Sequence, residues 1–301
     1  MTYKDPDVEN FCKTFQPVLA EFRHKPVAER RVIFDAQMDA IPLAEGCTIE
    51  SLDLSNVPAE RITHRGAAPG KTLLFLHGGG YLYGSLKSHR HLVSRFAVAA
   101  HVTAYHLDYR LAPEHPYPAA LEDAMSAYRR ILASGVAPKN LVVGGDSAGG
   151  NLAAALVLKA REEGLPQPAG LYLLSPWLDM SASGESYNAV GARDPVVSRA
   201  DAEAYAAAFL NGRRDDALTS PVRADLTDLP PTLIQVGTEE VLLSDSFNFA
   251  YRAALAGLDV ELRVWPEMTH DWPLFHPIIR AGLAAIEEAG QWMRQRIAVN
   301  G

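Results

Sequence analysis

Basic charge, cysteine and long apolar runs are all scarce in this sequence of 301 residues. It has 28 lysine and arginine residues against 36 aspartate and glutamate residues, which gives a formal net charge of −8. Proteins that bind nucleic acid without sequence preference need a basic face, and anionic membrane surfaces also attract basic segments. We therefore expect neither nucleic acid nor a membrane surface as a partner.

The two cysteines, Cys12 and Cys47, are too few for a disulfide framework and show no zinc-binding spacing. No apolar run approaches the roughly 20 residues that a membrane-spanning helix needs. The first residues, MTYKDPDVENFC, lack the basic segment and apolar stretch of a signal peptide. These absences predict a cytoplasmic protein without a membrane span.

From about residue 60 onward, short apolar runs alternate with segments of helical periodicity. This alternation predicts an α/β fold with a mostly parallel sheet covered by helices on both faces. Active sites in such sheets lie at the carboxyl ends of the strands. The expected strands are residues 72–76, 102–107, 140–143, 170–174, 232–236 and 260–265, and the expected helices are residues 118–132, 148–161, 244–255 and 277–297.

Two segments depart from this rhythm. Residues 7–22 carry an apolar stripe at helical spacing, which fits either a helix packed on the core or part of a lid. Residues 180–225, with an alanine-rich helix around residues 201–210, look like an excursion between two strands. We expect an N-terminal cap segment over residues 1–50 and a catalytic domain over residues 51–301, with a cap insertion at about 180–225.

The sequence Gly145-Asp146-Ser147-Ala148-Gly149 fits the pattern G-x-S-x-G between an expected strand and an expected helix. This context is the one in which the pattern forms a sharp turn that exposes a nucleophilic serine. A Gly-rich turn that only caps a helix is the alternative. The small flanking residues and the helix N-terminus behind it favour Ser147 as a nucleophile.

A serine nucleophile needs a general base and a carboxylate that orients the base. Two of the ten histidines, His270 and His276, follow the serine, and we prefer His270 because it lies in the loop after the last expected strand. For the acid we prefer Glu240, just past the strand at residues 232–236, with Glu239 and Asp245 as alternatives. Both glutamates could instead stabilise a helix N-terminus.

The sequence His77-Gly78-Gly79-Gly80 follows another expected strand. Glycines let backbone N–H groups point into a site with no Cβ in the way. We expect Gly78 and Gly79 to donate two hydrogen bonds to an oxyanion and Ala148 to donate a third. A lone HGGG could be a phosphate-binding loop, but its pairing with the separate G-x-S-x-G pattern favours the oxyanion hole.

The motifs HGGGYLYGS, YRLAPEHPYPAALED, GGDSAGGN and SPWLD, in this order and spacing, resemble the hormone-sensitive-lipase-like family of α/β-hydrolase carboxylesterases. The resemblance runs from about residue 60 to the C-terminus. It implies a serine hydrolase without a cofactor and with a helical cap built from the N-terminus and an insertion after the sixth strand. Members of the family often dimerise, so a homodimer is a further expectation.

Two positions depart from the family pattern. The acid motif, usually Asp-Pro-Leu, is Glu240-Val241-Leu242 here, so the acid is one methylene longer. The histidine motif, commonly His-Gly-Phe, is His270-Asp271-Trp272, which would change the pocket wall beside the leaving group.

Aromatic residues flank the expected site, as an apolar pocket for an uncharged ester requires. The candidates for the pocket wall are Tyr81, Trp177, Phe209 and Trp272. Histidines 89, 91, 101 and 106 show no ligand spacing with a carboxylate, so we expect no metal. The predicted function is hydrolysis of short-chain esters, about C2 to C8. A lactone hydrolase or amidase with the same triad, or a ligand receptor on the same fold, are the alternatives.

Overall fold

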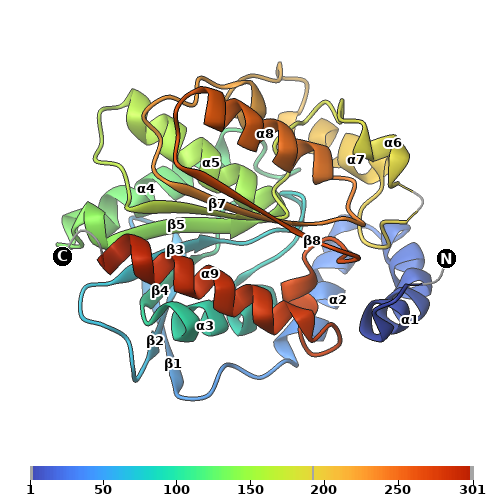
Figure 1. Cartoon of the computed structure of the whole chain (residues 1–301), viewed down its shortest axis with the longest axis horizontal. Helices are drawn as coiled ribbons and strands as arrows, with labels where there is room; N and C mark the ends of the chain where they lie inside the picture. The colour runs from blue at the N-terminus through green and yellow to red at the C-terminus, as the bar shows by residue number, and fades with distance from the viewer. Residues whose placement is uncertain (1–2, 192, 299–301) are drawn as a thin grey trace.

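The computed structural model describes residues 3–191 and 193–298 and is built around one eight-stranded sheet (Figure 1). The strand order is β1-β2-β4-β3-β5-β6-β7-β8. The strands are β1 (Cys47–Asp53), β2 (Pro58–His64), β3 (Thr72–Leu76), β4 (Thr103–Leu107), β5 (Leu141–Asp146), β6 (Gly170–Leu174), β7 (Thr232–Gly237) and β8 (Val260–Trp265).

Strands β3 to β8 form a parallel sheet, and β1 and β2 add an antiparallel edge beside β4. Every residue of β3, β5, β6 and β7 is buried, as expected for parallel strands covered on both faces. The registers place the carboxyl ends of β3 and β5 side by side, with Leu76 opposite Gly145. The fold is therefore the predicted α/β class, and the loops that carry the motifs meet at one edge.

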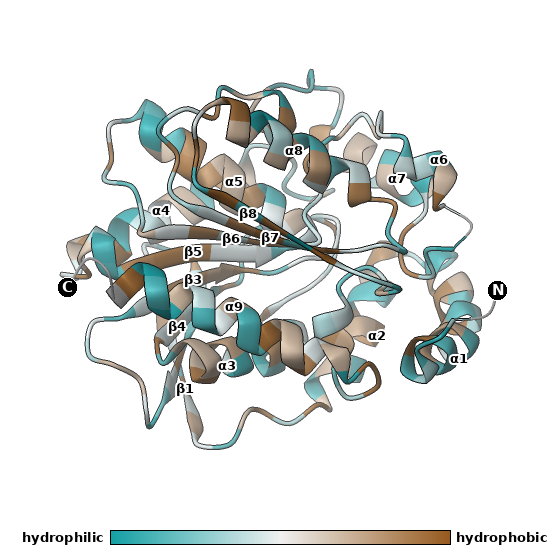
Figure 2. Ribbon diagram, in the orientation of Figure 1, coloured by the Kyte–Doolittle hydropathy of each residue, from teal (hydrophilic) through white to brown (hydrophobic). Residues whose placement is uncertain are grey.

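Helices cover both faces of the sheet (Figure 1). Helices α3 and α9 pack on one face, and α4, α5 and α8 pack on the other. In Figure 2 the central strands are largely brown, whereas α9 alternates between brown and teal, as a half-exposed helix does. The α-helices are α1 (Pro6–Arg23), α2 (Val27–Asp39), α3 (Leu86–Ala100), α4 (Ala119–Ala133), α5 (Ser147–Glu162), α6 (Ser186–Ala189), α7 (Arg199–Leu210), α8 (Leu243–Leu255) and α9 (Ala281–Ala298). Short 3-10 turns are η1 (Pro138–Asn140), η2 (Pro221–Arg223) and η3 (Trp272–Phe275).

The predicted elements are present, and three strands, β3, β6 and β8, have the predicted bounds. The terminal helix differs, because it begins at Ala281 and not at residue 277. The chain first forms η3, and the N–H groups of Ile278 and Ile279 both bond back to the Phe275 carbonyl. The strands β1 and β2 were not predicted from the sequence. No residue of β1 is fully buried, so its apolar pattern is weak.

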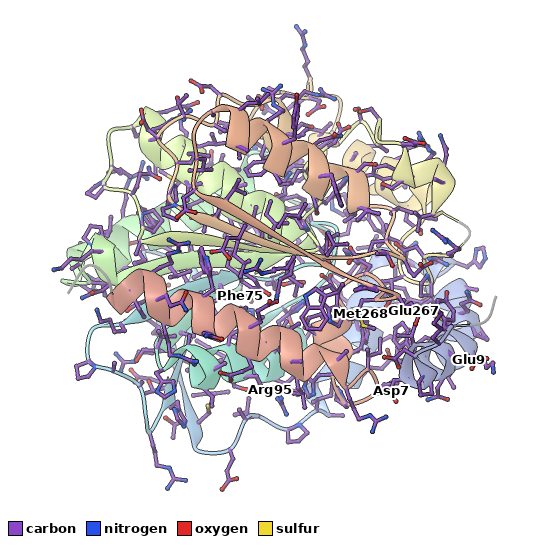
Figure 3. All side chains as sticks on the ribbon, viewed as in Figure 1. Asp7, Glu9, Phe75, Arg95, Glu267 and Met268 are labelled. Carbon is purple, nitrogen blue, oxygen red and sulfur yellow. The ribbon has the colours of Figure 1, made fainter. Side chains whose placement is uncertain are left out.

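The N-terminal helix α1 lies against the loop that follows β8, and α2 packs against α3. Figure 3 shows Glu267 and Met268 beside α1, near Asp7. The Glu267 carboxylate accepts the Lys4 N–H at 3.0 Å, and Arg280 Nε lies 2.8 Å from Asp7 Oδ2. Helix α1 is thus tied to the loop that follows β8. Because β1 begins at Cys47, the sheet starts inside the segment 1–50 that we assigned to the cap.

The excursion between β6 and β7 contains α6, α7 and η2. It meets the N-terminal segment through Arg23, whose Nε donates to Asp201 Oδ2 at 2.9 Å. The same guanidinium donates to the Val196 carbonyl at 3.1 Å. The two segments expected to form a cap therefore contact each other over the carboxyl edge of the sheet. Among the described residues, no helix is both long enough and apolar enough to cross a membrane.

Candidate active site

Ser147 lies at the turn between β5 and α5, with a backbone φ of +52°. This left-handed conformation is strained for a non-glycine residue and is common at functional sites. The flanking glycines permit it. A Cβ on Gly145 would lie 2.3 Å from the Gly149 carbonyl oxygen, and one on Gly149 would lie 2.0 Å from the Leu76 carbonyl oxygen. Both glycines are thus required by the close approach of β3, β5 and α5.

His270 lies in the loop after β8, and its Nε2 atom is 3.0 Å from Ser147 Oγ. The ring is 2% exposed, so this contact is shielded from bulk water. The other candidate, His276, points elsewhere, because its Nε2 lies 3.4 Å from Nδ1 of His91. Of the two candidate bases, the structure brings His270 to the serine.

Glu240 lies directly after β7, and its Oε2 is 3.2 Å from Nδ1 of His270. Its Oε1 accepts hydrogen bonds from Ser175 Oγ at 2.7 Å and from the Gly237 N–H at 2.6 Å. The extra methylene of glutamate is therefore accommodated, and the carboxylate is fixed from both sides. Serine, imidazole and carboxylate form a continuous chain of polar contacts.

The two alternative acids have other partners. Glu239 Oε2 lies 3.1 Å from Arg193 Nε. Asp245 Oδ2 accepts the backbone N–H groups of Leu178 and Asp179 at 2.8 and 2.9 Å. Neither has a described contact with His270, and Asp245 instead fixes the loop after β6.

The triple-glycine loop differs from the sequence expectation at one residue. The N–H of Gly78 donates to Asp146 Oδ2 at 3.1 Å, so this N–H is directed away from a substrate. Gly79 and Gly80 line the cavity beside Ser147, whereas Gly78 does not. The assignment of Gly78 as an oxyanion donor is therefore wrong. Gly79 has a φ of +111°, and a Cβ there would lie 2.1 Å from the Tyr83 carbonyl oxygen, so the loop needs glycine.

A second carboxylate, that of Asp271, lies beside His270. Asp271 is the residue at which this chain departs from the His-Gly-Phe pattern. Asp271 Oδ2 is 3.0 Å from Nε2 of His270. Burial opposes protonation of His270, but the carboxylates of Asp271 and Glu240 outweigh it and raise the pKa of the imidazole well above its usual value. Burial also raises the pKa of Asp271 to about 7.

Ser147, His270 and Asp271 line a cavity of about 980 Å³, part of it open to solvent. Its wall is mainly apolar, as a site for uncharged substrates requires. Helices α1 and α2 supply much of this wall, through Phe15, Val18, Leu19, Phe22, Phe34 and Met38. Four of these residues lie in the apolar stripe of residues 7–22, which predicted a helix on the core or part of a lid. Phe34 and Met38 lie outside that stripe and were not predicted.

Only one of the four aromatic pocket candidates, Trp177, lines this cavity. The ring of Tyr81 stacks on Phe209 with centroids 3.8 Å apart, and its hydroxyl donates to Asn151 at 2.7 Å. Trp272 is fully buried against Trp265. For Tyr81, Phe209 and Trp272 the expectation is therefore wrong, because these rings turn from the loops into the core.

Several histidines cluster under the triple-glycine loop. His77 and His89 have ring centroids 5.4 Å apart, and His77 and His106 are 5.8 Å apart. Within the described part of the chain, no group of three or more His, Cys, Asp or Glu side chains is arranged to hold a metal ion. His89 instead lies 3.2 Å from Asp146 Oδ2, where it supports the carboxylate that holds Gly78.

Comparisons with known proteins agree with this architecture. A family profile described as the alpha/beta hydrolase fold matches residues 73–274. An acetyl-hydrolase of Streptomyces hygroscopicus is 40% identical over 278 residues, which cover 90% of this chain and 91% of that protein. An esterase of Acinetobacter venetianus is 34% identical over 86% of each chain.

Solved structures give the same picture over nearly the whole length. The crystal structure of an esterase from the bacterial hormone-sensitive lipase family matches with a TM-score of 0.93 and 40% identity, over 98% of this chain and 100% of that one. A hormone-sensitive lipase from a metagenome library matches with a TM-score of 0.92 and 38% identity, over 99% and 100% of the two chains.

Proposed function

This chain belongs to the alpha/beta-hydrolase family and, within it, to the bacterial hormone-sensitive-lipase group of esterases, and from that premise we propose that it hydrolyses short-chain carboxylic esters through Ser147, His270 and Glu240. The observation that carries this proposal is the 3.0 Å contact between His270 Nε2 and Ser147 Oγ at the base of an apolar cavity. A nucleophile and a base within hydrogen-bond reach, with the base oriented by a third group, is the arrangement that acyl transfer needs.

The first half of the reaction forms an acyl-enzyme. Ser147 Oγ attacks the ester carbonyl carbon while Nε2 of His270 takes the hydroxyl proton. Glu240 holds the Nδ1–H of His270 and stabilises the imidazolium that forms. The tetrahedral intermediate then collapses, and His270 gives the proton to the departing alkoxide, which leaves as an alcohol.

The second half repeats these steps with water. His270 takes a proton from a water molecule, whose oxygen attacks the acyl carbon, and the bond to Ser147 Oγ breaks. The proton returns to the serine, and the carboxylic acid leaves. No redox step and no further reactant is needed.

We assign the oxyanion to the backbone N–H groups of Gly79, Gly80 and Ala148. Gly79 and Gly80 line the cavity, and Ala148 lies at the N-terminus of α5, where backbone N–H groups and the helix dipole favour negative charge. The Gly78–Asp146 hydrogen bond holds the start of the loop in place. Loss of one such donor costs about 10²–10³ in rate in related chemistry.

Short acyl chains, about C2 to C8, are favoured because helices α1 and α2 close the cavity with bulky side chains. Hydrolysis of p-nitrophenyl acetate, butyrate and palmitate, with lactones added to the panel, tests this. The expected result is fastest turnover of acetate or butyrate, and faster turnover of palmitate or of the lactones would contradict it. Labelling of Ser147 by a fluorophosphonate separates an enzyme from a ligand receptor with an inert serine.

We also propose that the chain forms a homodimer through α8 and β8. Phe247, Tyr251 and Leu255 are 47%, 67% and 71% exposed and, four residues apart, share one helical face. Strand β8 ends the described sheet, so its outer edge is unpaired there. Light scattering should give the dimer mass for the wild type and the monomer mass for Leu255→Glu, and a monomeric wild type would contradict this.

A further inference from the structure

Asp271 is a buried carboxylate that the proposed mechanism does not use. Its side chain lines the active-site cavity, and the residue is 5% exposed. Oδ2 lies 3.0 Å from Nε2 of His270, but Oδ1 is buried and has no hydrogen-bond partner among the described residues. Burying a carboxylate oxygen without a hydrogen-bond partner costs free energy, and a donor on a bound molecule would supply that partner.

The backbone of Asp271, not its side chain, serves the local structure. Its N–H donates to Ser175 Oγ at 3.3 Å, and its carbonyl accepts the Leu274 N–H at 2.8 Å. Its φ of +51° is a conformation that aspartate and asparagine tolerate better than most residues. The loop therefore does not need a carboxylate here, which leaves the side chain for substrate.

The contact with His270 places this carboxylate beside the leaving group. Nε2 delivers a proton to the departing oxygen, so that oxygen must come within about 3 Å of Nε2. Asp271 Oδ2 is at a similar distance from the same nitrogen. The departing oxygen and Asp271 Oδ2 therefore lie no more than about 6 Å apart, a span that a hydroxyl on the neighbouring carbon can bridge.

The other charged groups of the cavity wall favour a donor at this place. Arg23 is occupied, because it binds Asp201 and the Val196 carbonyl. Asp146 is held by Gly78 and His89 and adds negative charge, as does Glu240 behind His270. Most of the remaining wall is apolar. The carboxylate therefore has no cation to neutralise it other than protonated His270.

We propose that Asp271 accepts a hydrogen bond from a hydroxyl on the carbon adjacent to the one that carries the scissile oxygen, so that partial esters of diols and polyols are preferred substrates. This inference rests on the proposed ester hydrolysis and specifies its alcohol side. It gives the departure from the family's His-Gly-Phe pattern a role in specificity.

The test uses two esters that differ only in the donor, 2-hydroxyethyl butyrate and 2-methoxyethyl butyrate. The readout is the ratio of their kcat/KM values at one pH, which cancels the titration of His270 because both substrates use the same base. A hydrogen bond to a charged group predicts a ratio of at least about ten in the wild type. The ratio should fall in Asp271→Asn, which keeps a neutral acceptor, and approach one in Asp271→Leu.

Glu239→Gln is the matched control, because it removes a nearby carboxylate that does not line the cavity, and its ratio should equal that of the wild type. A wild-type ratio near one overturns the inference, as does a high ratio that persists in both Asp271 variants. If Asp271→Leu does not fold, the wild-type ratio and Asp271→Asn still decide. Turnover of p-nitrophenyl butyrate is measured alongside, since its absence in the wild type would refute the proposed function itself.

Discussion

The backbone N–H of Gly78 donates to the carboxylate of Asp146 at 3.1 Å. This bond joins the end of β3 to the residue before Ser147, so the loop and the nucleophile keep a fixed relative position. A Cβ on Gly78 would lie 2.3 Å from Asp146 Oδ2, which shows how closely the two segments approach. Because this hydrogen bond occupies the Gly78 N–H, the oxyanion hole that we propose uses the two glycines that follow.

Removal of this carboxylate should impair the loop and not the nucleophile. We expect Asp146→Ala to lower kcat by about 10²-fold, since loss of an oxyanion donor costs about that much. Asp146→Asn keeps an acceptor for the Gly78 N–H and should restore most of the activity. Burst kinetics with p-nitrophenyl butyrate measure both, and an Asn variant as poor as the Ala variant would exclude this role.

Substitution of three neighbouring carboxylates tests which one is the acid of the triad. Glu240→Gln should lower kcat by about 10³-fold or more, because it removes the charge that stabilises the His270 imidazolium. Glu239→Gln and Asp245→Asn should cost far less kcat, since their carboxylates bind Arg193 and the Leu178 loop. Steady-state kinetics of the three variants rank them, and a reversed ranking would move the role to another residue.

The pH dependence follows from the raised pKa of His270. The base must be neutral to act, so kcat/KM should rise with pH and reach its plateau well above pH 6.5. Because Asp271 favours the imidazolium, Asp271→Asn should shift the acidic limb to lower pH. A pH profile of the wild type and the variant measures the shift, and coincident limbs would show that Asp271 leaves the titration of His270 unchanged.

Stability in acid should depend on His106, which is fully buried with both ring nitrogens unpartnered among the described residues. Burial holds its pKa well below the usual value, so below about pH 6.5 the unfolded chain binds a proton that the folded chain does not. The free energy of unfolding then falls by up to about 1.4 kcal/mol per pH unit for this residue. His106→Leu should make the slope shallower between pH 4.5 and 6.5 in urea titrations, although burial also lowers the pKa of His77, His91 and His276, and an unchanged slope would contradict this.

Acyl-chain selectivity should depend on the aromatic wall that α1 provides. Phe22 lines the cavity and packs edge-on against Tyr83, with ring centroids 5.5 Å apart. We expect Phe22→Ala to move the optimum towards longer p-nitrophenyl esters by removing bulk from the wall. Val32→Ala on α2, at a residue that is 69% exposed, is the control and should leave the optimum in place.

The sequence was most informative where the backbone dictates residue type. Gly145 and Gly149 indicate a turn so tight that no Cβ fits. The buried strands appear in the sequence as continuous apolar runs. The positions of Ser147, His270 and Glu240 after strands β5, β8 and β7 were therefore predictable. Their approach to one another follows from parallel strands that end at one edge.

The sequence was least informative about the direction in which side chains turn. Tyr81 and Trp272 both follow strand ends, yet one reaches Asn151 and the other packs on Trp265. The N–H of Gly78 is occupied by Asp146, a residue 68 positions away along the chain. The apolar stripe of α1 indicated burial, but only packing against the carboxyl edge makes Phe22 a wall of the site.

Ser147 and His270, the ends of the proton relay that we propose, lie 123 residues apart in the chain, and α1 is tied to the loop beyond β8. A ribosome-bound chain that has already folded around Ser147 still lacks His270 and the segment on which the first helix rests. With the proposed triad, hydrolytic competence therefore requires the last strand and the docking of the first helix.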